Sequence, residues 1–380
     1  MNKRIRLGMI GGGSGSFIGI VHRIAAYMGE DYELIGGVFG SRFAESQQFA
    51  RSLQLDVNRT YPNIEEMIAA EEQIPESERI EAVVILTPNF LHHANAKALI
   101  QAGYHIICEK PITTTLAEAL DLQSLVEKHE VVFALTHTYT GYPMVRQMKA
   151  MIAEGIIGNV QRVDAQYYQG WINPVIHEPE KRKTVWRLDP KVSGISCCMG
   201  DIGVHAFNLI EYTTAIKTEK VLADLNTLYE DNPLDVDGTV MVRMENGAKG
   251  VIRSSQIATG EENNLTIAIY GDKGGLKWEQ ESPTNLVWMP EGEPARTLKP
   301  GNPYNSDFAN NSTKIAPGHP EGLFDAMGNI YRGAASAIRK MEYENGAFPT
   351  VEDGVRGMKF IESVVQSSNE DNVWISMAIG

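Results

Sequence analysis

Residues 5–19 read IRLGMIGGGSGSFIG. Residues 5–10 are a short strand-like run, and residues 18–28, after the glycines, have the apolar period of a helix. Glycine permits a tight turn and a close approach of the backbone to a ligand, and the start of a helix presents unpaired N–H groups to an anion. A strand, a glycine loop and a helix in this order predict a dinucleotide-binding unit.

The spacing of the glycines departs from the usual Gly-x-Gly-x-x-Gly pattern. Gly11 and Gly13 fit the first two positions, and Gly19 is the best match for the third, after about three extra residues. Flexible turns also contain glycine clusters, but a position between a strand and a helix favours cofactor binding. The loop residues expected to bind the cofactor are Gly11, Gly13, Ser16, Phe17 and Ile18.

The end of the second predicted strand, Tyr32–Phe39, bears on the choice between NAD and NADP. NAD enzymes usually place an acid there for the ribose 2′-hydroxyl. Here Phe39 is followed by Gly40, Ser41 and Arg42. A hydroxyl beside a guanidinium suits the 2′-phosphate of NADP, so the sequence leans towards NADP. The alternatives are NAD and an arginine that is merely solvated in a turn.

The first third of the chain alternates short apolar runs with helical periods. Strands are expected at 5–10, 32–39, 82–86, 104–108 and 131–135, with helices at 18–28, 44–53, 63–70, 92–102 and 116–129. This alternation predicts a doubly wound parallel sheet, a Rossmann domain over residues 1–140.

The pattern changes in the remainder of the chain. A helix at 145–154 and a strand at 160–168 precede a loop, the segment 200–213, six strand-like runs between 221 and 289, and helices at 323–341 and 351–368. Turn signals separate the strand-like runs, as in antiparallel hairpins. We therefore expect residues 141–380 to form an α+β domain with a large open antiparallel sheet.

Composition narrows the possible partners. The chain has 380 residues, with 34 Lys+Arg against 48 Asp+Glu, a net charge of −14. A field of this sign repels nucleic acid and anionic membranes, which argues against both as partners. Three cysteines form no disulfide framework, and no signal peptide or apolar membrane-spanning run is apparent. The chain is expected to be cytoplasmic.

Three further motifs occur at fitting intervals. They are TPNFLH at residues 87–92, CEKP at 108–111 and GDIGVH at 200–205. Together with the glycine loop, they resemble the Gfo/Idh/MocA family of oxidoreductases, named for glucose–fructose oxidoreductase, inositol dehydrogenase and a rhizopine-catabolism protein. The resemblance extends over nearly the whole chain. It implies a Rossmann domain, a second domain with an open sheet, and homodimers or homotetramers formed through that sheet.

The resemblance also implies roles for particular residues. Lys110 is similar to a lysine that contacts the substrate hydroxyl and the nicotinamide ribose, and Asp201 and His205 are similar to the active-site pair. Trp186 and Arg187 match a pair that often reaches the nicotinamide region. The positions that match cofactor-lining residues are Thr87, Pro88, Asn89, His92, Glu109 and Lys110.

The chemistry of alcohol oxidation needs such groups. A base must take the hydroxyl proton while a hydride leaves carbon for the nicotinamide, and another group must stabilise the developing alkoxide. His205 suits proton transfer and Lys110 suits stabilisation of the alkoxide. Asp201, four residues before His205, would orient the imidazole or bind a second substrate hydroxyl. Taken singly, an aspartate at a helix start is more often an N-cap, and a histidine or lysine is more often structural or exposed.

Other residues are candidates for the substrate pocket. Tyr139, Tyr142, Trp171 and Trp186 have rings suited to stacking on a sugar, although core packing is the alternative for each. His319 ends a long loop rich in Asn, Pro, Ser and Gly, residues 299–320, which is either functional or mobile. No third ligand accompanies His92 and His93 or Asp201 and His205, so no metal site is predicted.

The sequence thus predicts an NAD(P)-dependent dehydrogenase or reductase of carbohydrate metabolism that acts on a secondary alcohol or ketone of a sugar, glycoside or inositol. One alternative is a reductase of the same fold for a dihydrodiol, a bile pigment or an imine-like compound. Another is a non-catalytic NAD(P)-binding sensor, which has no need of Lys110, Asp201 and His205 together. A cofactor that stays bound between turnovers is also compatible with the sequence.

Overall fold

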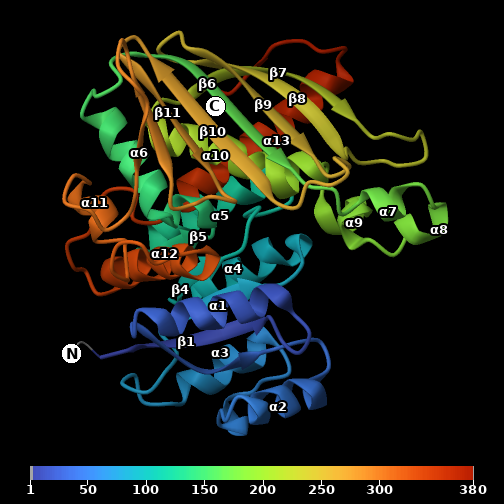
Figure 1. Ribbon diagram of the computed structural model, residues 1–380. Coiled ribbons are helices and arrows are strands. Elements are labelled where there is room, and N and C mark those ends of the chain that lie inside the picture. Colours follow the sequence, from blue (N-terminus) through green and yellow to red (C-terminus); the bar gives the residue numbers. More distant parts are fainter. Residues whose placement is uncertain (1–2, 380) are drawn as a thin grey trace. The chain divides into compact units, whose positions relative to one another are not determined.

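The computed structural model describes residues 3–379 and divides the chain into two compact units (Figure 1). Unit 1 comprises Met1–Thr113, Ala117–Gly141 and Leu323–Val355, and unit 2 comprises Thr114–Leu116, Tyr142–Gly322 and Arg356–Gly380. The chain passes from one unit to the other at residue 141, beside the boundary expected at 140. Residues 323–355, which the sequence assigned to the second domain, are counted with unit 1.

Unit 1 contains a five-stranded sheet with the order β2-β1-β3-β4-β5, in which every pair is parallel. The strands are β1 (Ile5–Gly11), β2 (Tyr32–Val38), β3 (Ala82–Leu86), β4 (His105–Cys108) and β5 (Phe133–Leu135). The helices are α1 (Phe17–Met28), α2 (Phe43–Ser52), α3 (Ile64–Glu72), α4 (His92–Gln101), α5 (Leu116–His129) and α12 (Leu323–Ile338), and the 3₁₀ turns are η1 (Val57–Arg59), η2 (Asn89–Leu91) and η3 (Thr138–Gly141). The expectation of a parallel Rossmann-type sheet is confirmed.

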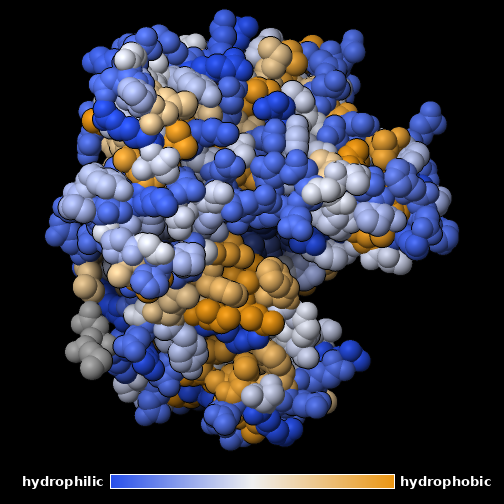
Figure 2. Space-filling model, viewed as in Figure 1, coloured by the Kyte–Doolittle hydropathy of each residue, from blue (hydrophilic) through white to orange (hydrophobic). Residues whose placement is uncertain are grey.

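Helix α12 belongs to unit 1 because its apolar face completes the core of that unit. Met327, Ile330 and Tyr331 are buried with side chains of β1 and α1, and Figure 1 shows α12 beside α1. The opposite face of α1 is also apolar. It exposes Phe17, Ile20, Ile24 and Tyr27, and Figure 2 shows this apolar surface over α1.

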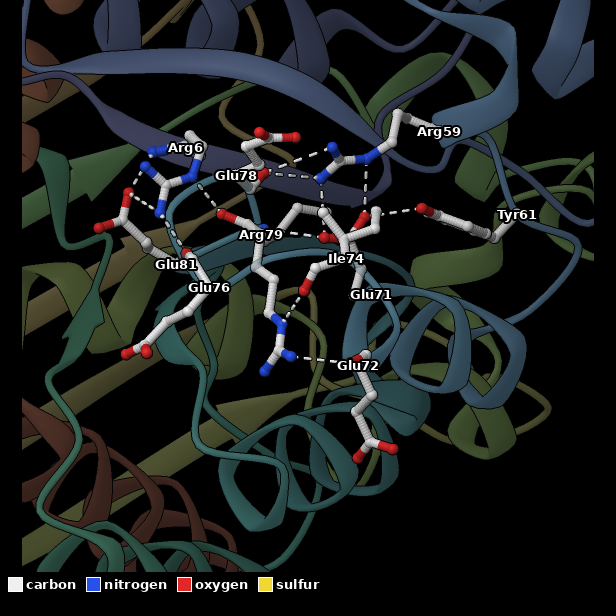
Figure 3. Close-up of polar contacts among 11 residues, drawn as sticks. Arg6, Arg59, Tyr61, Glu71, Glu72, Ile74, Glu76, Glu78, Arg79 and Glu81 are labelled. Carbon is white, nitrogen blue, oxygen red and sulfur yellow. Dashed lines mark hydrogen bonds and ion pairs between the residues drawn. The ribbon is translucent and has the colours of Figure 1, made fainter.

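A buried ion pair stabilises the segment between β2 and β3 (Figure 3). The guanidinium of Arg59 donates two hydrogen bonds, of 2.8 and 2.7 Å, to the carboxylate of Glu71, whose side chain is fully buried. The hydroxyl of Tyr61 and the backbone N–H of Ile80 also donate to this carboxylate, at 2.6 and 2.9 Å. Glu71 thereby connects η1, α3 and the chain entering β3. Arg6 of β1 forms a neighbouring ion pair with Glu81 at 3.0 Å.

Unit 2 contains a nine-stranded sheet with the order β13-β12-β11-β10-β6-β9-β8-β7-β14. The strands are β6 (Val160–Tyr168), β7 (Thr218–Asn226), β8 (Asp237–Met244), β9 (Lys249–Ser255), β10 (Asn264–Gly271), β11 (Gly274–Glu279), β12 (Leu286–Pro290), β13 (Arg296–Leu298) and β14 (Ile375–Ser376). The expected large open sheet is confirmed, and it is antiparallel except that β6 pairs with β9 in parallel. The helices that pack with it are α6 (Pro143–Ala153), α10 (Val204–Thr214) and α13 (Val351–Asn369).

Residues 170–194, where the sequence predicted only a loop, form an arm of short helical turns. These are α7 (Asn173–Ile176), α8 (Pro179–Arg182), η4 (Trp186–Leu188) and α9 (Pro190–Ser193). The arm has a small core of its own, in which Ile172, Ile176 and Leu188 pack with Leu234 and Val236. Arg182 also pairs with Asp231 at 2.5 Å, so the arm is fixed to the β7–β8 connection.

The long polar loop at 299–320 is also anchored. It contains the short helix α11 (Asp307–Asn310). Arg146 of α6 donates to Ser312 at 2.7 Å and lies over the ring of Phe308, and Gln147 accepts a hydrogen bond from the N–H of Ser306. Within residues 3–379, no helix is both long and apolar enough to cross a membrane.

Candidate active site

The glycine loop of unit 1 has the geometry that a dinucleotide requires. Helix α1 begins at Phe17, and the hydroxyl of Ser16 caps it by accepting the N–H of Gly19 at 3.1 Å. A Cβ atom at Gly13 would lie 2.3 Å from the carbonyl oxygen of Phe39, and one at Gly19 would lie 2.3 Å from that of Gly12. Only glycine fits at either position, which supports the match of Gly19 to the third glycine despite its late place in the sequence. The helix start then offers N–H groups to a pyrophosphate.

A cavity of about 190 Å³ lies at the end of β2. Its lining includes Gly13, Ser41, Arg42 and Glu45. Arg42 is mostly exposed and forms an ion pair with Glu45 at 2.8 Å. The cavity therefore offers a hydroxyl and a guanidinium to the ribose of a dinucleotide, with Glu45 as the competing partner for the guanidinium. The strand order reverses between β1 and its neighbour β3, and ligands of open α/β sheets bind at such a point, beyond the carboxyl ends of the strands.

The TPNFLH motif follows β3 and leads into α4. His92 is buried, and its Nδ1 and Nε2 atoms each lie 2.8 Å from a carbonyl oxygen, those of Pro111 and Thr87 respectively. Burial lowers the pKa of His92, against the effect of these two hydrogen bonds. His92 therefore connects the loops that follow β3 and β4. Its direct contact with a cofactor, like that of Thr87, Pro88 and Asn89, stays a prediction.

Glu109 and Lys110 follow β4, and the Glu109 carboxylate has several partners. Its Oε1 atom lies 2.6 Å from the Thr136 hydroxyl and 2.9 Å from Nε2 of His22, and its Oε2 atom accepts the backbone N–H of Lys110 at 3.2 Å. Burial by itself raises the pKa of Glu109, but the bonds and charges of His22, Lys110 and Thr136 outweigh burial and lower the pKa to about 2. Glu109 is therefore ionised at neutral pH.

Sequence reasoning missed His137, which lies near the charges of Lys110 and Glu109. It is buried, and burial followed by the positive charge of Lys110 lowers its pKa to about 3. The imidazole is therefore neutral at physiological pH. It follows β5, at the same edge of the sheet as Lys110, and that position was the available sequence signal.

Asp201 of unit 2 lies inside a π-helical turn, η5 (Met199–Gly203), directly before α10. The alternative that Asp201 is an N-cap is wrong, because other side chains satisfy the N–H groups of this helix start. The buried carboxylate of Asp235 accepts the N–H groups of Cys197 and Met199 at 3.0 and 2.8 Å, and the hydroxyl of Ser196 accepts that of Gly200 at 3.0 Å. The side chain of Asp201 is thus available for other contacts.

Those contacts come from Gln256, directly after β9, and from Arg187 of the arm. The Oδ2 atom of Asp201 accepts a hydrogen bond of 2.8 Å from the side chain of Gln256 and lies 3.1 Å from Nε of Arg187. The guanidinium of Arg187 lies over the rings of Trp186 and Trp171, 4.4 and 5.6 Å from their centroids. The structure therefore brings together four residues that the sequence had singled out, Asp201, Arg187, Trp171 and Trp186, and adds Gln256.

His205 lies in the first turn of α10 and is mostly buried, with its ring 6.2 Å from that of Tyr167. The active-site roles expected for Lys110, in unit 1, and for Asp201 and His205, in unit 2, stay predictions.

The remaining substrate candidates differ in their surroundings. Trp171 is 39% exposed and Trp186 is 42% exposed. Tyr139 is buried in η3, and His319 is exposed, with Nδ1 3.1 Å from the carbonyl oxygen of Ala316. Tyr142 is buried against Trp278, their centroids 5.3 Å apart, which favours the core-packing interpretation, so we leave Tyr142 out of the proposed substrate site.

No group of three or more His, Cys, Asp or Glu side chains within residues 3–379 is arranged to hold a metal ion. Cys108, Cys197 and Cys198 are buried, and burial raises the pKa of Cys108 and Cys198. These two thiols therefore stay protonated and act as packing groups.

Comparison with known proteins agrees with the fold and the loop. Residues 5–137 match the model of the oxidoreductase family with an NAD-binding Rossmann fold, and residues 145–277 match the GFO/IDH/MocA C-terminal domain. The chain belongs to the Gfo/Idh/MocA family of oxidoreductases. As a member of this family, it is an NAD(P)-dependent dehydrogenase or reductase.

Several relatives within the Gfo/Idh/MocA family resemble the chain over most of its length. An uncharacterized oxidoreductase, YfiI of Bacillus subtilis, is 34% identical over 99% of this chain and 97% of its own. An inositol dehydrogenase homolog from Azotobacter vinelandii, solved with NADH and myo-inositol, is 30% identical, with a TM-score of 0.90 over 99% of this chain and 98% of its own. The levoglucosan dehydrogenase of Pseudarthrobacter phenanthrenivorans is 27% identical over 78% of this chain and 80% of its own.

Proposed function

We propose that this protein transfers a hydride between a nicotinamide dinucleotide and a secondary alcohol or ketone of an inositol, a sugar or a glycoside. The observation that carries the proposal is the group around Asp201, in which Gln256 and Arg187 hold one carboxylate and two partly exposed tryptophans pack against Arg187. A polyhydroxylated ring needs several hydrogen-bonding groups beside an aromatic face, and this group supplies both. The relatives named for inositol and levoglucosan support the same substrate class.

We assign the chemical roles as follows. The imidazole of His205 takes the proton of the substrate hydroxyl, and the ammonium of Lys110 donates a hydrogen bond to the developing alkoxide. The electron pair and hydrogen of the C–H bond leave together as hydride, and the C–O bond becomes C=O. The bound nicotinamide supplies the acceptor for that hydride. Asp201, fixed by Gln256 and Arg187, binds a second hydroxyl of the substrate. In the direction of reduction, His205 returns the proton.

The test is a panel of inositols, hexoses, anhydrosugars and glycosides, monitored for nicotinamide reduction with NAD and with NADP. Turnover of at least one of these polyols is expected. A dihydrodiol, a bile pigment and an imine are assayed beside the panel, with oxidation of NAD(P)H as the readout for the compounds that would be reduced. Turnover confined to these three compounds would favour the alternative reductase, and tight NAD(P)H binding without turnover of any compound would favour a sensor.

Gln256→Leu is expected to lower kcat/KM about tenfold, because Asp201 loses a hydrogen bond to a charged group and is no longer held in one orientation. Steady-state kinetics with the best polyol measure the change. The control is Gln366→Leu on α13, which removes an exposed bond to Glu370 and is expected to keep wild-type kinetics. Equal kcat/KM in the wild type and in Gln256→Leu would show that Asp201 does not bind the substrate.

Arg42→Ala is expected to weaken NADPH binding about tenfold and to leave NADH binding nearly unchanged, because the lost guanidinium would pair with the 2′-phosphate that only NADPH carries. Fluorescence titration of both cofactors measures the two affinities. Glu45→Gln should act in the opposite direction, since it releases Arg42 from its ion pair. An unchanged NADPH affinity in Arg42→Ala would show that the exposed arginine is only a solvated turn residue.

A further inference from the structure

A chain of buried polar side chains connects α1 to the end of β4. The side chain of His22, on the covered face of α1, is 0% exposed. Its Nε2 atom lies 2.9 Å from Oε1 of Glu109, and its Nδ1 atom lies 2.7 Å from the hydroxyl of Tyr331 on α12. These residues are far apart in the sequence, and all of them belong to unit 1.

The chemistry of these groups determines the direction of the hydrogen bonds. Burial raises the pKa of Tyr331 well above its ordinary value, so the phenol keeps its proton. The ionised Glu109 carboxylate only accepts, so Nε2 of His22 donates to it, and in the neutral imidazole Nδ1 then accepts the proton of the Tyr331 hydroxyl. Tyr331 thus holds the other ring nitrogen of His22 while Nε2 donates to Glu109.

Glu109 is also attached to the chain that carries Lys110. Its Oε2 atom accepts the N–H of Lys110, and its Oε1 atom accepts the Thr136 hydroxyl at the end of β5. The carboxylate is therefore held from α1, from β5 and from the Lys110 backbone at once. A shift of this carboxylate would move the start of the segment from which the Lys110 side chain extends.

We propose that His22, oriented by Tyr331, is a positioning residue that fixes the Glu109 carboxylate and thereby holds Lys110 in place for the reaction. Helix α1 also begins at the glycine loop. The His22 side chain therefore connects the helix expected to bind the cofactor to the end of β4, which carries Lys110. This inference rests on the proposed function for the role of Lys110, whereas the control of Glu109 by His22 does not.

The pH dependence of activity should change when His22 is replaced. Burial favours a neutral Glu109, and the hydrogen bond from His22 helps to keep it ionised. Removing that donor raises the pH at which Glu109 takes up a proton, so activity should be lost earlier on acidification. The titratable and charged groups that face Glu109 are His22 of α1, Tyr331 of α12, His92 of α4, Cys108 and Lys110 beside it, and His137 after β5.

The experiment compares His22→Leu, which keeps the bulk but has no donor, with His22→Gln, whose amide N–H is able to replace Nε2. The control is His105→Leu at the start of β4, the end away from Glu109, which removes one partly buried imidazole hydrogen bond, the one that His105 Nδ1 accepts from the N–H of Val132. Infrared spectroscopy follows the protonated-carboxyl band that Glu109→Gln removes. Thermal unfolding of each variant verifies that it is folded.

We expect the wild type to show no such band at any pH at which it stays folded. In His22→Leu the pKa of Glu109 should rise by about one to two units, the equivalent of one charge-assisted hydrogen bond, so that the band appears at an acidic pH at which the folded wild type shows none. With the best polyol, kcat of His22→Leu should fall about tenfold or more, with KM for the dinucleotide within about twofold of wild type. His22→Gln should be close to the wild type in both the pKa of Glu109 and kcat, and His105→Leu should show neither change.

Two results would overturn the inference. One is a His22→Leu variant that has the kcat of the wild type and, like the wild type, shows no Glu109 band at any pH at which it stays folded. The other is a similar loss of kcat in His22→Leu, His22→Gln and His105→Leu, which would indicate general damage to the fold. If the wild type oxidises no polyol, the proposed function fails, and the infrared midpoint alone still decides whether His22 controls Glu109.

Discussion

Lys110→Ala is expected to lower kcat about a thousandfold, because the variant lacks the ammonium that donates to the developing alkoxide. The dinucleotide should still bind, since the glycine loop, the start of α1 and the cavity at the end of β2 are unaffected. Steady-state kinetics with the best polyol give kcat, and titration with NADH or NADPH gives the affinity. The expected signature is a large fall in turnover with an affinity within about tenfold of wild type.

The matched control for Lys110→Ala is Lys97→Ala. Lys97, on α4 of the same unit, pairs with Asp121 at 2.9 Å and is partly exposed, so its loss should leave kcat unchanged. His205→Asn should resemble Lys110→Ala in kcat and should also remove the limb of the pH–rate profile that reports the base. Turnover within about threefold of wild type in both Lys110→Ala and His205→Asn would refute the proposed mechanism.

Glu71→Ala is expected to lower the free energy of unfolding by about 3–5 kcal/mol, because it leaves the guanidinium of Arg59 without its buried partner. The Tyr61 hydroxyl and the Ile80 N–H lose their acceptor in the same step, and such groups are costly to leave unsatisfied. Urea unfolding monitored by circular dichroism measures the change. This loss is a large part of the stability of an ordinary domain.

Glu72→Ala is the control for Glu71→Ala. Glu72 is the next residue of α3 and is exposed, so its replacement should change the free energy of unfolding by less than about 0.5 kcal/mol. If Glu71→Ala unfolded at the same urea concentration as Glu72→Ala, the ion pair with Arg59 would contribute nothing to stability.

The features predicted correctly from the sequence depend on local patterns. The strand Ile5–Gly11, the glycine loop and α1 follow one another within the first 28 residues, and each has a local cause in apolar period, glycine or capping. The fully buried strand Ala82–Leu86 was visible as a continuous apolar run. The parallel sheet of unit 1 and the open sheet of unit 2 followed from the change in the hydrophobic pattern after residue 142 and from the family motifs.

The features that sequence reasoning missed depend on partners distant in the sequence. The π-helical turn at Asp201 depends on Asp235, which supplies its cap from 34 residues further along the chain. The arm consists of turns of three or four residues, too short for any apolar period, and packs against the β7–β8 connection. The apolar period of α12 was visible in the sequence, but the surface against which the helix packs was not. That surface is formed by β1 and α1, about 300 residues earlier in the chain.

By itself, the sequence determined the secondary-structure order of unit 1, the dinucleotide loop and the residue types needed for hydride transfer from an alcohol. Only the tertiary structure decided which side chains pair with them: His22 with Glu109, Gln256 and Arg187 with Asp201, and Glu71 with Arg59. The physical reason is that glycine loops and apolar periods act over a few residues, whereas a buried polar group must find its partner wherever the packed chain brings one.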